Sequence, residues 1–181
     1  GTVQADSLGE GQGTTITLRL PLRDLSEELI GAIDLQPIVL AAPVNVSSDD
    51  VPSLDGLHVL VVDDLIDTRD LLKFVLEGYG AEVLTVGNAR SAIAALTENP
   101  GKYDVLISDI GMPEEDGYFL IREVRSLAAS AGGEIPAAAL TAYAGDRERE
   151  MAIEAGFQRH IAKPVKPVQL GLIVANLAGR F

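Results

Sequence analysis

The 181-residue chain contains no cysteine, and this absence excludes disulfide scaffolds and thiolate metal sites and favours a reducing compartment. It has few basic side chains, 14 Lys and Arg against 27 Asp and Glu, so its formal net charge is -13. A sequence-independent grip on nucleic acid requires basic patches, so no nucleic-acid partner is expected. No apolar run approaches the roughly 20 residues that span a bilayer, and no signal pattern opens the chain. We therefore expect a cytoplasmic location without membrane contact.

Hydrophobic residues make up 47% of the sequence and charged residues 23%, as is typical of a globular protein. Residues 58–179 alternate short apolar runs with amphipathic segments. The runs predict strands at 57–63, 82–86, 104–109, 136–141 and 157–162, and the intervening patterns predict helices at 67–80, 88–100, 115–133, 146–156 and 167–179. The prediction is an α/β fold of five βα units, with a doubly wound, five-stranded parallel sheet.

Residues near the expected helix ends support this pattern. Asp67 or Thr68 is expected to cap the first helix and Asn88 the second. Pro167 is favoured in the first turn of the last helix.

The N-terminal third has a different character. "GEGQGT" at 9–14 is rich in glycine, but it runs into "TTITLRLPL", where apolar and polar residues alternate as in a strand. No helix opens on the glycines, so a glycine-rich hairpin turn is favoured over a dinucleotide site. Residues 23–56 mix prolines, serines and acids as linkers do, with a short helix conceivable at 25–35. The expected division is a hairpin at 1–22, a linker at 23–56 and the α/β domain at 57–181.

Polar residues follow the expected strands. They are Asp63 and Asp64 at the end of the first strand, Asp109 at the end of the third, Thr141 at the end of the fourth and Lys163 after the fifth. Ligands of open α/β sheets bind at this edge. Three clustered carboxylates repel one another unless a cation is present, and Mg2+ prefers oxygen ligands. A carboxylate beside such an ion can attack phosphorus, while a lysine and a hydroxyl stabilise the transferred group. Each residue taken alone is typical of an ordinary loop or strand, and only their common location at one edge of the predicted sheet indicates a site.

Four motifs in this order resemble the receiver domains of response regulators in two-component signalling. They are "VLVVDD" at 59–64, "VLISDIGMPEEDGY" at 105–118, "ALTAYA" at 139–144 and "HIAKPV" at 160–165. The resemblance implies a flavodoxin-like receiver fold, with Asp109 as phosphoacceptor. It also implies that Asp63, Asp64, Asp109 and the backbone carbonyl of Gly111 hold Mg2+, and that Thr141 acts as the switch hydroxyl.

Lys163, rather than Lys166, matches the lysine of the family, because it directly follows the fifth strand. Both precede proline, and the family usually holds the first such bond cis. His160 stands where the family has its switch aromatic, so the resemblance implies that His160 shares the switch with Thr141, although as a histidine. Leu65 stands where an acid or amide is common. Gly111 and Tyr143 resemble positions that tune the lifetime of the phosphoryl group.

Residues 1–22 resemble the last β-hairpin of the ATP-binding domain of sensor histidine kinases. Together with the initial Gly1 in place of Met, this implies a fragment from the carboxyl end of a hybrid sensor histidine kinase, whose nucleotide-binding boxes lie upstream. The implied partners are the dimerisation and phosphoacceptor domain of a histidine kinase and a histidine phosphotransfer protein. We expect residues 1–22 to be mobile or to pair with a second copy, which leaves a homodimer open.

Two other functions compete with phosphoacceptance. Phosphatases of the haloacid dehalogenase type also use Asp and Mg2+ in an α/β fold, but they carry a second acid two residues after the nucleophile, where this chain has Gly111. A docking or dimerisation module, built on residues 146–156 and the surface around His160, needs no phosphorylation. Neither His58 nor His160 lies in a helical acceptor motif, so both are interpreted as structural. Self-dephosphorylation is the only turnover expected of the fragment itself.

Overall fold

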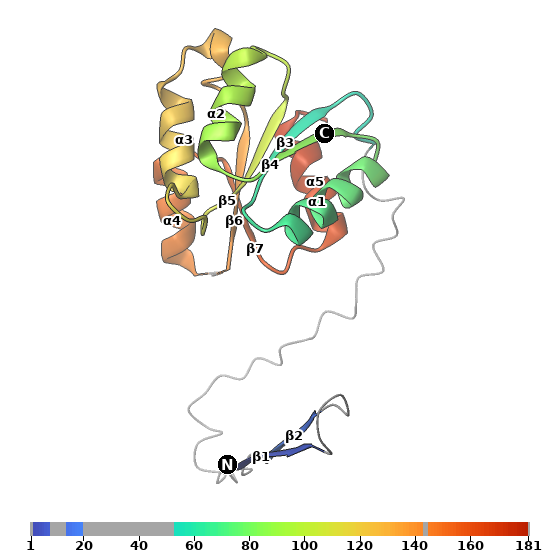
Figure 1. The fold of residues 1–181 in the computed structure, drawn as a ribbon. Coiled ribbons are helices and arrows are strands. Elements are labelled where there is room, and N and C mark those ends of the chain that lie inside the picture. The colour runs from blue at the N-terminus through green and yellow to red at the C-terminus, as the bar shows by residue number, and fades with distance from the viewer. Residues whose placement is uncertain (1, 8–13, 20–52, 143–144, 181) are drawn as a thin grey trace, which may run out of the picture. The chain divides into compact units, whose positions relative to one another are not determined.

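A computed structural model describes residues 2–7, 14–19, 53–142 and 145–180 of the chain (Figure 1). It divides into two units, Gly1–Val44 and Asn45–Phe181. The conceivable helix at 25–35, most of the predicted linker and Tyr143 lie outside the described residues.

The first unit contains an antiparallel hairpin. Strand β1 (Thr2–Ser7) pairs with β2 (Thr14–Arg19), with Thr2 opposite Arg19 and Ser7 opposite Thr14. The strand predicted after the glycine-rich stretch is therefore confirmed.

The second unit is built on a parallel sheet in the order β4-β3-β5-β6-β7. Its strands are β3 (His58–Val62), β4 (Glu82–Val86), β5 (Val105–Asp109), β6 (Ala137–Thr141) and β7 (Arg159–Ala162). All neighbouring strands pair in parallel, which confirms the predicted doubly wound α/β fold. The strand order reverses at β3, which lies between β4 and β5. Such a reversal is where open α/β sheets bind their ligands.

Five helices cover the two faces of this sheet (Figure 1). They are α1 (Ile66–Gly78), α2 (Ala89–Glu98), α3 (Gly117–Ser126), α4 (Asp146–Ala155) and α5 (Pro167–Leu177). Buried residues of α1 and α5 pack with Val59 and Val61 on one face. Buried residues of α2, α3 and α4 pack with Leu60 and Val62 on the other. The central strands are therefore buried on both faces, which explains their continuous apolar runs. No helix of the described segments is long and apolar enough to cross a membrane.

The core extends to the segment where the sequence indicates the domain boundary. Leu54 is fully buried, packs in the same cluster as Leu72 and Leu76 of α1, and donates its backbone N–H to the Tyr79 carbonyl at 2.8 Å. Leu57, at 5% exposure, belongs to the same cluster.

Three helix ends test the capping predictions. Asn88 accepts a hydrogen bond from the Ser91 amide at 2.8 Å, which confirms it as the cap of α2. Pro167 opens α5 as predicted. The prediction for α1 is wrong, because the helix already begins at Ile66, after Leu65, with no side-chain cap. Asp63 closes the preceding turn instead, by accepting the Leu65 amide at 2.9 Å.

The amphipathic pattern at 115–133 also overestimates the third helix. Asp116 caps the start of α3 through the Phe119 amide, and the helix ends at Ser126. A short 3-10 turn, η3 (Ala129–Ala131), follows it. Gly133 passes so close to the Leu127 carbonyl that an added Cβ would collide with it, a tertiary constraint that helical periodicity does not record.

Candidate functional site

The acidic pair follows the central strand β3. The Asp63 amide donates to the Val86 carbonyl at 3.2 Å, so the edge of the sheet continues one residue beyond β3. Asp63 is fully buried and Asp64 is half-buried. Both side chains therefore lie at the point where the strand order reverses.

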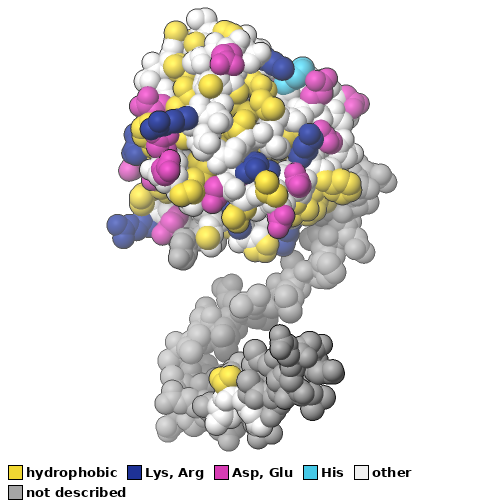
Figure 2. Space-filling model, in the orientation of Figure 1, with side chains coloured by type: hydrophobic (Ala, Val, Ile, Leu, Met, Phe, Trp, Pro, Cys, Tyr) yellow, Lys and Arg dark blue, Asp and Glu magenta, His cyan; other side chains and the backbone are white. Residues whose placement is uncertain are grey.

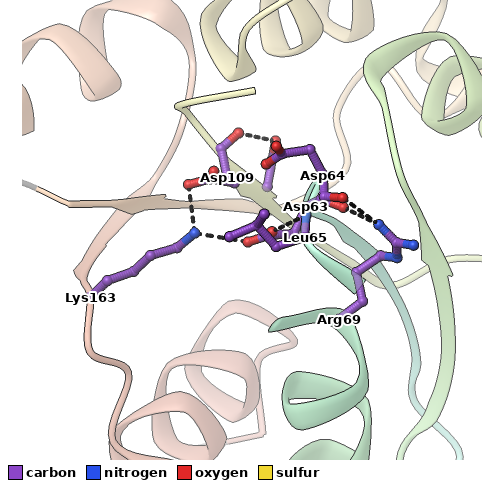
Figure 3. A network of polar contacts seen from close by, with 7 residues as sticks. Asp63, Asp64, Leu65, Arg69, Asp109 and Lys163 are labelled. Carbon is purple, nitrogen blue, oxygen red and sulfur yellow. Dashed lines mark hydrogen bonds and ion pairs between the residues drawn. The ribbon is translucent and has the colours of Figure 1, made fainter. Parts of the chain in front are cut away.

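Asp109 ends the neighbouring strand β5, and its residue is only 7% exposed. Lys163, one residue beyond β7, reaches across the edge of the sheet. Its Nζ lies 2.8 Å from Asp63 Oδ2 and 3.0 Å from Asp109 Oδ1 (Figure 3). One ammonium thus joins two carboxylates that come from different strands.

The charges in this cluster depend on one another. Burial alone would lower the pKa of Lys163, but hydrogen bonds to Asp63 and Asp109, together with the negative charges of both carboxylates, outweigh burial and raise the pKa above its ordinary 10.5. Lys163 is therefore fully protonated at neutral pH. It offsets part of the repulsion among three carboxylates.

The carboxylate set suits a hard divalent cation. Asp63, Asp64 and Asp109 each offer one oxygen, and these oxygens lie within 4.8 Å of one another. An all-oxygen set with one half-exposed member suits Mg2+, which keeps several waters and needs few protein ligands. Gly111 lies beside this set, because an added Cβ there would be 3.8 Å from Asp109 Oδ2. The residues present therefore fit the cation that the sequence predicts.

Thr141 ends β6, is 5% exposed and faces the histidine of the neighbouring strand. Its Oγ1 lies 2.9 Å from Nε2 of the half-buried His160. This side-chain contact was not anticipated from the sequence, although the parallel register of β6 and β7 explains it. Thr141 is paired with Ala162, two residues beyond His160.

A cavity of about 400 Å³ opens beside Asp109. It is lined by Asp109, Ile110, Gly111, Tyr118, Thr141, Ala142, Glu148, Met151 and Lys163. Burial raises the pKa of the Tyr118 phenol, with smaller contributions from the charges of Glu148 and Asp116. Tyr118, Glu148 and Met151 were not predicted from the sequence, because their own motifs carry no chemical signal and only the approach of α3 and α4 brings them here.

The structure also separates the two lysines. Lys163 lies in the cluster, whereas the exposed Lys166 precedes α5 as its N-cap residue. The Lys163–Pro164 peptide bond is cis, as the resemblance implied. Gly117, at the start of α3, leaves room for the Asp109 carbonyl, with which an added Cβ would collide.

Arg69 is a residue of this site that the sequence reading missed. Its Nη1 donates to the carbonyl oxygens of Asp63 at 2.7 Å and Asp64 at 3.1 Å (Figure 3). The available signal was its position, one helical turn into the segment that follows the acidic pair. A lone arginine in an amphipathic helix gives no reason to look there.

An acidic cluster at the point where the strand order of a doubly wound sheet reverses is typical of domains that handle phosphoryl groups with a divalent cation. Residues 59–175 match the response regulator receiver domain, and the chain belongs to this family.

Curated relatives fall into two kinds. An uncharacterized 14.6 kDa protein in the sodA1 3' region of Leptolyngbya boryana is 46% identical over 129 residues, which cover 71% of this chain and 95% of that protein. The sensor histidine kinase RcsC of Salmonella typhimurium is 31% identical over 136 residues, covering 75% of this chain but 14% of the kinase. The match thus covers almost the whole length of one small protein but only a small part of a much longer kinase.

Solved structures agree with the family. The receiver domain of the sensor histidine kinase PA1611 from Pseudomonas aeruginosa, with magnesium coordinated in its active-site cleft, is 30% identical and superimposes with a TM-score of 0.62. The alignment covers 68% of this chain and 98% of that domain. A response regulator from Chloroflexus aurantiacus is 31% identical, with a TM-score of 0.63 over 68% of this chain and 98% of the other.

Proposed function

We propose that the chain accepts a phosphoryl group from a phosphohistidine on Asp109, in a reaction that depends on Mg2+. The observation that carries this proposal is the buried Asp109 carboxylate, which lies 3.0 Å from Lys163, within 4.8 Å of the other two carboxylates and beside an open cavity. The Lys163 ammonium offsets only part of the negative charge of the three carboxylates, and the remaining negative charge favours binding of a cation.

In the proposed step, an Asp109 carboxylate oxygen forms a bond to phosphorus while the bond between phosphorus and the donor imidazole nitrogen breaks. The bonding electron pair returns to that nitrogen, so histidine is regenerated. Bound Mg2+ would supply charge neutralisation for the phosphoryl oxygens, held by Asp63, Asp64, Asp109 and the Gly111 carbonyl. Lys163 would stabilise the negative charge on the phosphoryl oxygens during transfer.

Thr141 and His160 are the proposed switch. In this proposal Nε2 of His160 is the acceptor of its 2.9 Å contact with the Thr141 hydroxyl, so donation of that hydroxyl to a phosphoryl oxygen competes with the contact. Phosphorylation then shifts the equilibrium between two arrangements of β6 and β7, so that a local change alters the surface that these strands help to form. In this proposal Gly111 and Tyr143 influence how long the phosphoryl group lasts before hydrolysis or onward transfer.

The proposed setting is a hybrid histidine kinase, with residues 1–22 as the last hairpin of its ATP-binding domain. The match to part of RcsC supports this setting, as does the described β1–β2 hairpin that precedes the receiver unit. The partners would be a phosphohistidine-bearing kinase domain and a histidine phosphotransfer protein. Because kinases make phosphohistidine from ATP, we place the reaction in the cytoplasm.

An exposed apolar face on α1 fits a helical partner. Beside the acidic pair, Leu65 is 58% and Ile66 63% exposed, and further along α1 Leu71 is 56% and Phe74 77% exposed. In Figure 2 apolar side chains lie among charged ones over this part of the molecule. Large exposed apolar residues that lie together often mark an interaction site, whereas single ones scattered over a surface do not. Its place next to the phosphoacceptor edge suits a protein that presents a phosphohistidine.

Intact-mass measurement after incubation with acetyl phosphate tests the chemistry. We expect one phosphoryl group on the wild type with Mg2+, and none on Asp109→Asn or without metal. Beryllofluoride, observed through the NMR signals of Thr141 and His160, covers the case of a receiver that does not use small donors. Absence of both responses would overturn the proposal and favour the phosphorylation-independent docking module.

A second experiment separates partner recognition from chemistry. Phe74→Ser should slow transfer from a phosphorylated histidine phosphotransfer protein and leave labelling by acetyl phosphate unchanged. The matched control is Ile153→Ser, which removes a 47% exposed residue of α4. Slower transfer with Ile153→Ser alone would move the docking surface for the phosphoryl donor to α4.

A further inference from the structure

We infer that Arg69 is a positioning residue for the cation site, and that it raises Mg2+ affinity although it adds a positive charge beside that site. The inference rests on the proposed Mg2+-dependent function. It concerns only how this chain holds its acidic pair.

The contacts of Arg69 differ from those of Lys163. Lys163 Nζ occupies carboxylate oxygens, Asp63 Oδ2 at 2.8 Å and Asp109 Oδ1 at 3.0 Å. Arg69 leaves the carboxylates alone and binds the backbone carbonyls of Asp63 and Asp64. Figure 3 shows the two cations approaching the acidic pair from opposite sides. Lys163 therefore competes with a metal ion for ligand atoms, whereas Arg69 does not.

The turn that carries the pair has few other constraints. The first turn of α1 has no side-chain cap, and Asp63 Oδ1 accepts the Leu65 amide at 2.9 Å. Arg69 lies in the same helix and donates its own backbone amide to the Leu65 carbonyl at 3.1 Å. Its guanidinium thus links the first turn of α1 to the backbone of Asp63 and Asp64. With their backbone fixed, the two carboxylates need less reordering when a cation binds, and partners of metal ligands commonly contribute in this way.

Gly87 makes space for this guanidinium. It follows β4, and an added Cβ would lie 3.2 Å from Arg69 Nη1 and 3.6 Å from Cζ. Such a methyl group requires the guanidinium to shift by a few tenths of an ångström. Gly87→Ala therefore perturbs the same contact from the opposite side without changing any charge.

Two mechanisms give opposite signs for the loss of Arg69. If Arg69 acted only through its charge, Arg69→Met would strengthen Mg2+ binding, because one repelling charge is removed. If it acts by positioning, Arg69→Met weakens binding by about 10-fold or more, the usual consequence of losing a partner of a metal ligand. Lys163→Met, which frees two carboxylate oxygens, should strengthen binding under either mechanism.

The test is titration of the whole chain with MgCl2, followed by calorimetry and by backbone NMR signals of residues 63–65. We expect weaker binding for Arg69→Met, an intermediate loss for Arg69→Lys and a smaller loss for Gly87→Ala. Arg122→Met, which removes an exposed arginine of α3, serves as the charge-matched control and should bind as the wild type does. Gly87→Ala should add nothing in the Arg69→Met background, because its effect passes through Arg69.

Two further readouts exclude a general loss of structure. Without metal, the Leu65 amide should exchange faster in Arg69→Met than in the wild type, and labelling of Asp109 should recover at saturating Mg2+. Equal or tighter Mg2+ binding by Arg69→Met overturns the inference while wild-type binding upholds the proposed function. Absence of Mg2+ binding by the wild type overturns both.

Discussion

The two ends of the same sheet carry comparable groups in different surroundings. At the amino end, His58 Nε2 lies 3.3 Å from Glu82 Oε2 and Nδ1 lies 3.8 Å from Asp104 Oδ2, with side-chain exposures of 34%, 74% and 43%. At the carboxyl end, the side chains of Lys163 and Asp109 are 25% and 9% exposed and that of Asp63 is fully buried. Water screens the first group, whereas the second must balance its own charge.

This difference is the reason to place the proposed chemistry at the carboxyl end of the sheet. Exposed ion pairs contribute little, since solvent competes with each partner. The three carboxylates, of which Asp64 is only half-buried, carry more negative charge than the ammonium of Lys163 and the nearby guanidinium of Arg69 offset, and this excess favours binding of a cation. The parallel sheet produces the asymmetry, because all five strands deliver their last residues to the same edge.

The largest expected contrast concerns metal linkage. Mg2+ at about 100 times its dissociation constant should raise the free energy of unfolding by about 2.7 kcal/mol, because the cation binds only the folded cluster. Asp64→Asn should remove most of this gain, and Glu82→Gln at the amino end should keep it. Urea unfolding with and without MgCl2 measures both. An equal loss in the two variants would mean that the cation responds to net charge rather than to this site.

Removal of the half-buried Lys163 ammonium is the next contrast. Without metal, Lys163→Met should lower the free energy of unfolding by about 2 kcal/mol, because hydrogen bonds to charged groups are lost and two carboxylates remain without their cation. Lys102, at the amino end, lies 5.6 Å from the centroid of the Tyr103 ring. Lys102→Met should cost less than about 1 kcal/mol, as expected for an exposed cation–π contact. Similar losses would abolish the distinction between the two ends.

The pH dependence of this difference has a defined sign. The pKa of Lys163 is raised in the folded state by its two carboxylate partners, so its stabilisation is fully present below the ordinary value of 10.5. It is lost as the pH rises through the folded-state pKa. The advantage of the wild type over Lys163→Met should therefore stay constant from neutral pH to about pH 10 and fall above it. Urea titrations in alkaline buffers test this, and a decline that begins near pH 7 would contradict it.

The sequence predicts the frame of this molecule better than its details. Asp63, Asp109 and Lys163 could be predicted as neighbours, because each stands at the carboxyl end of a predicted strand and parallel strands end at the same edge of the sheet. Arg69 was missed because it acts on backbone carbonyls, which leave no mark in the sequence. The cap of α1 was also wrongly predicted. Asp63 closes the turn before the helix through the Leu65 amide, and the residue types at 67–68 carry no information about that contact.

The contacts between β6 and β7 illustrate the same limit. His160 was interpreted as structural with respect to phosphoacceptance, and its place at the family's switch position paired it with Thr141 without predicting a contact between them. In the structure it contacts the Thr141 hydroxyl at 2.9 Å. The register of two strands must be known before this contact can be seen.

The smallest expected contrast compares the two histidines. His160→Phe should cost about 1 kcal/mol of unfolding free energy, the usual contribution of one hydrogen bond. His58→Phe removes contacts to two exposed carboxylates and should cost less. Function should separate them further. Phenylalanine cannot compete for the Thr141 hydroxyl, so beryllofluoride should saturate His160→Phe at a lower concentration than the wild type, with His58→Phe unchanged. Fluorine and methyl NMR titrations measure this, and an unshifted His160→Phe curve would mean that the Thr141 contact does not oppose activation.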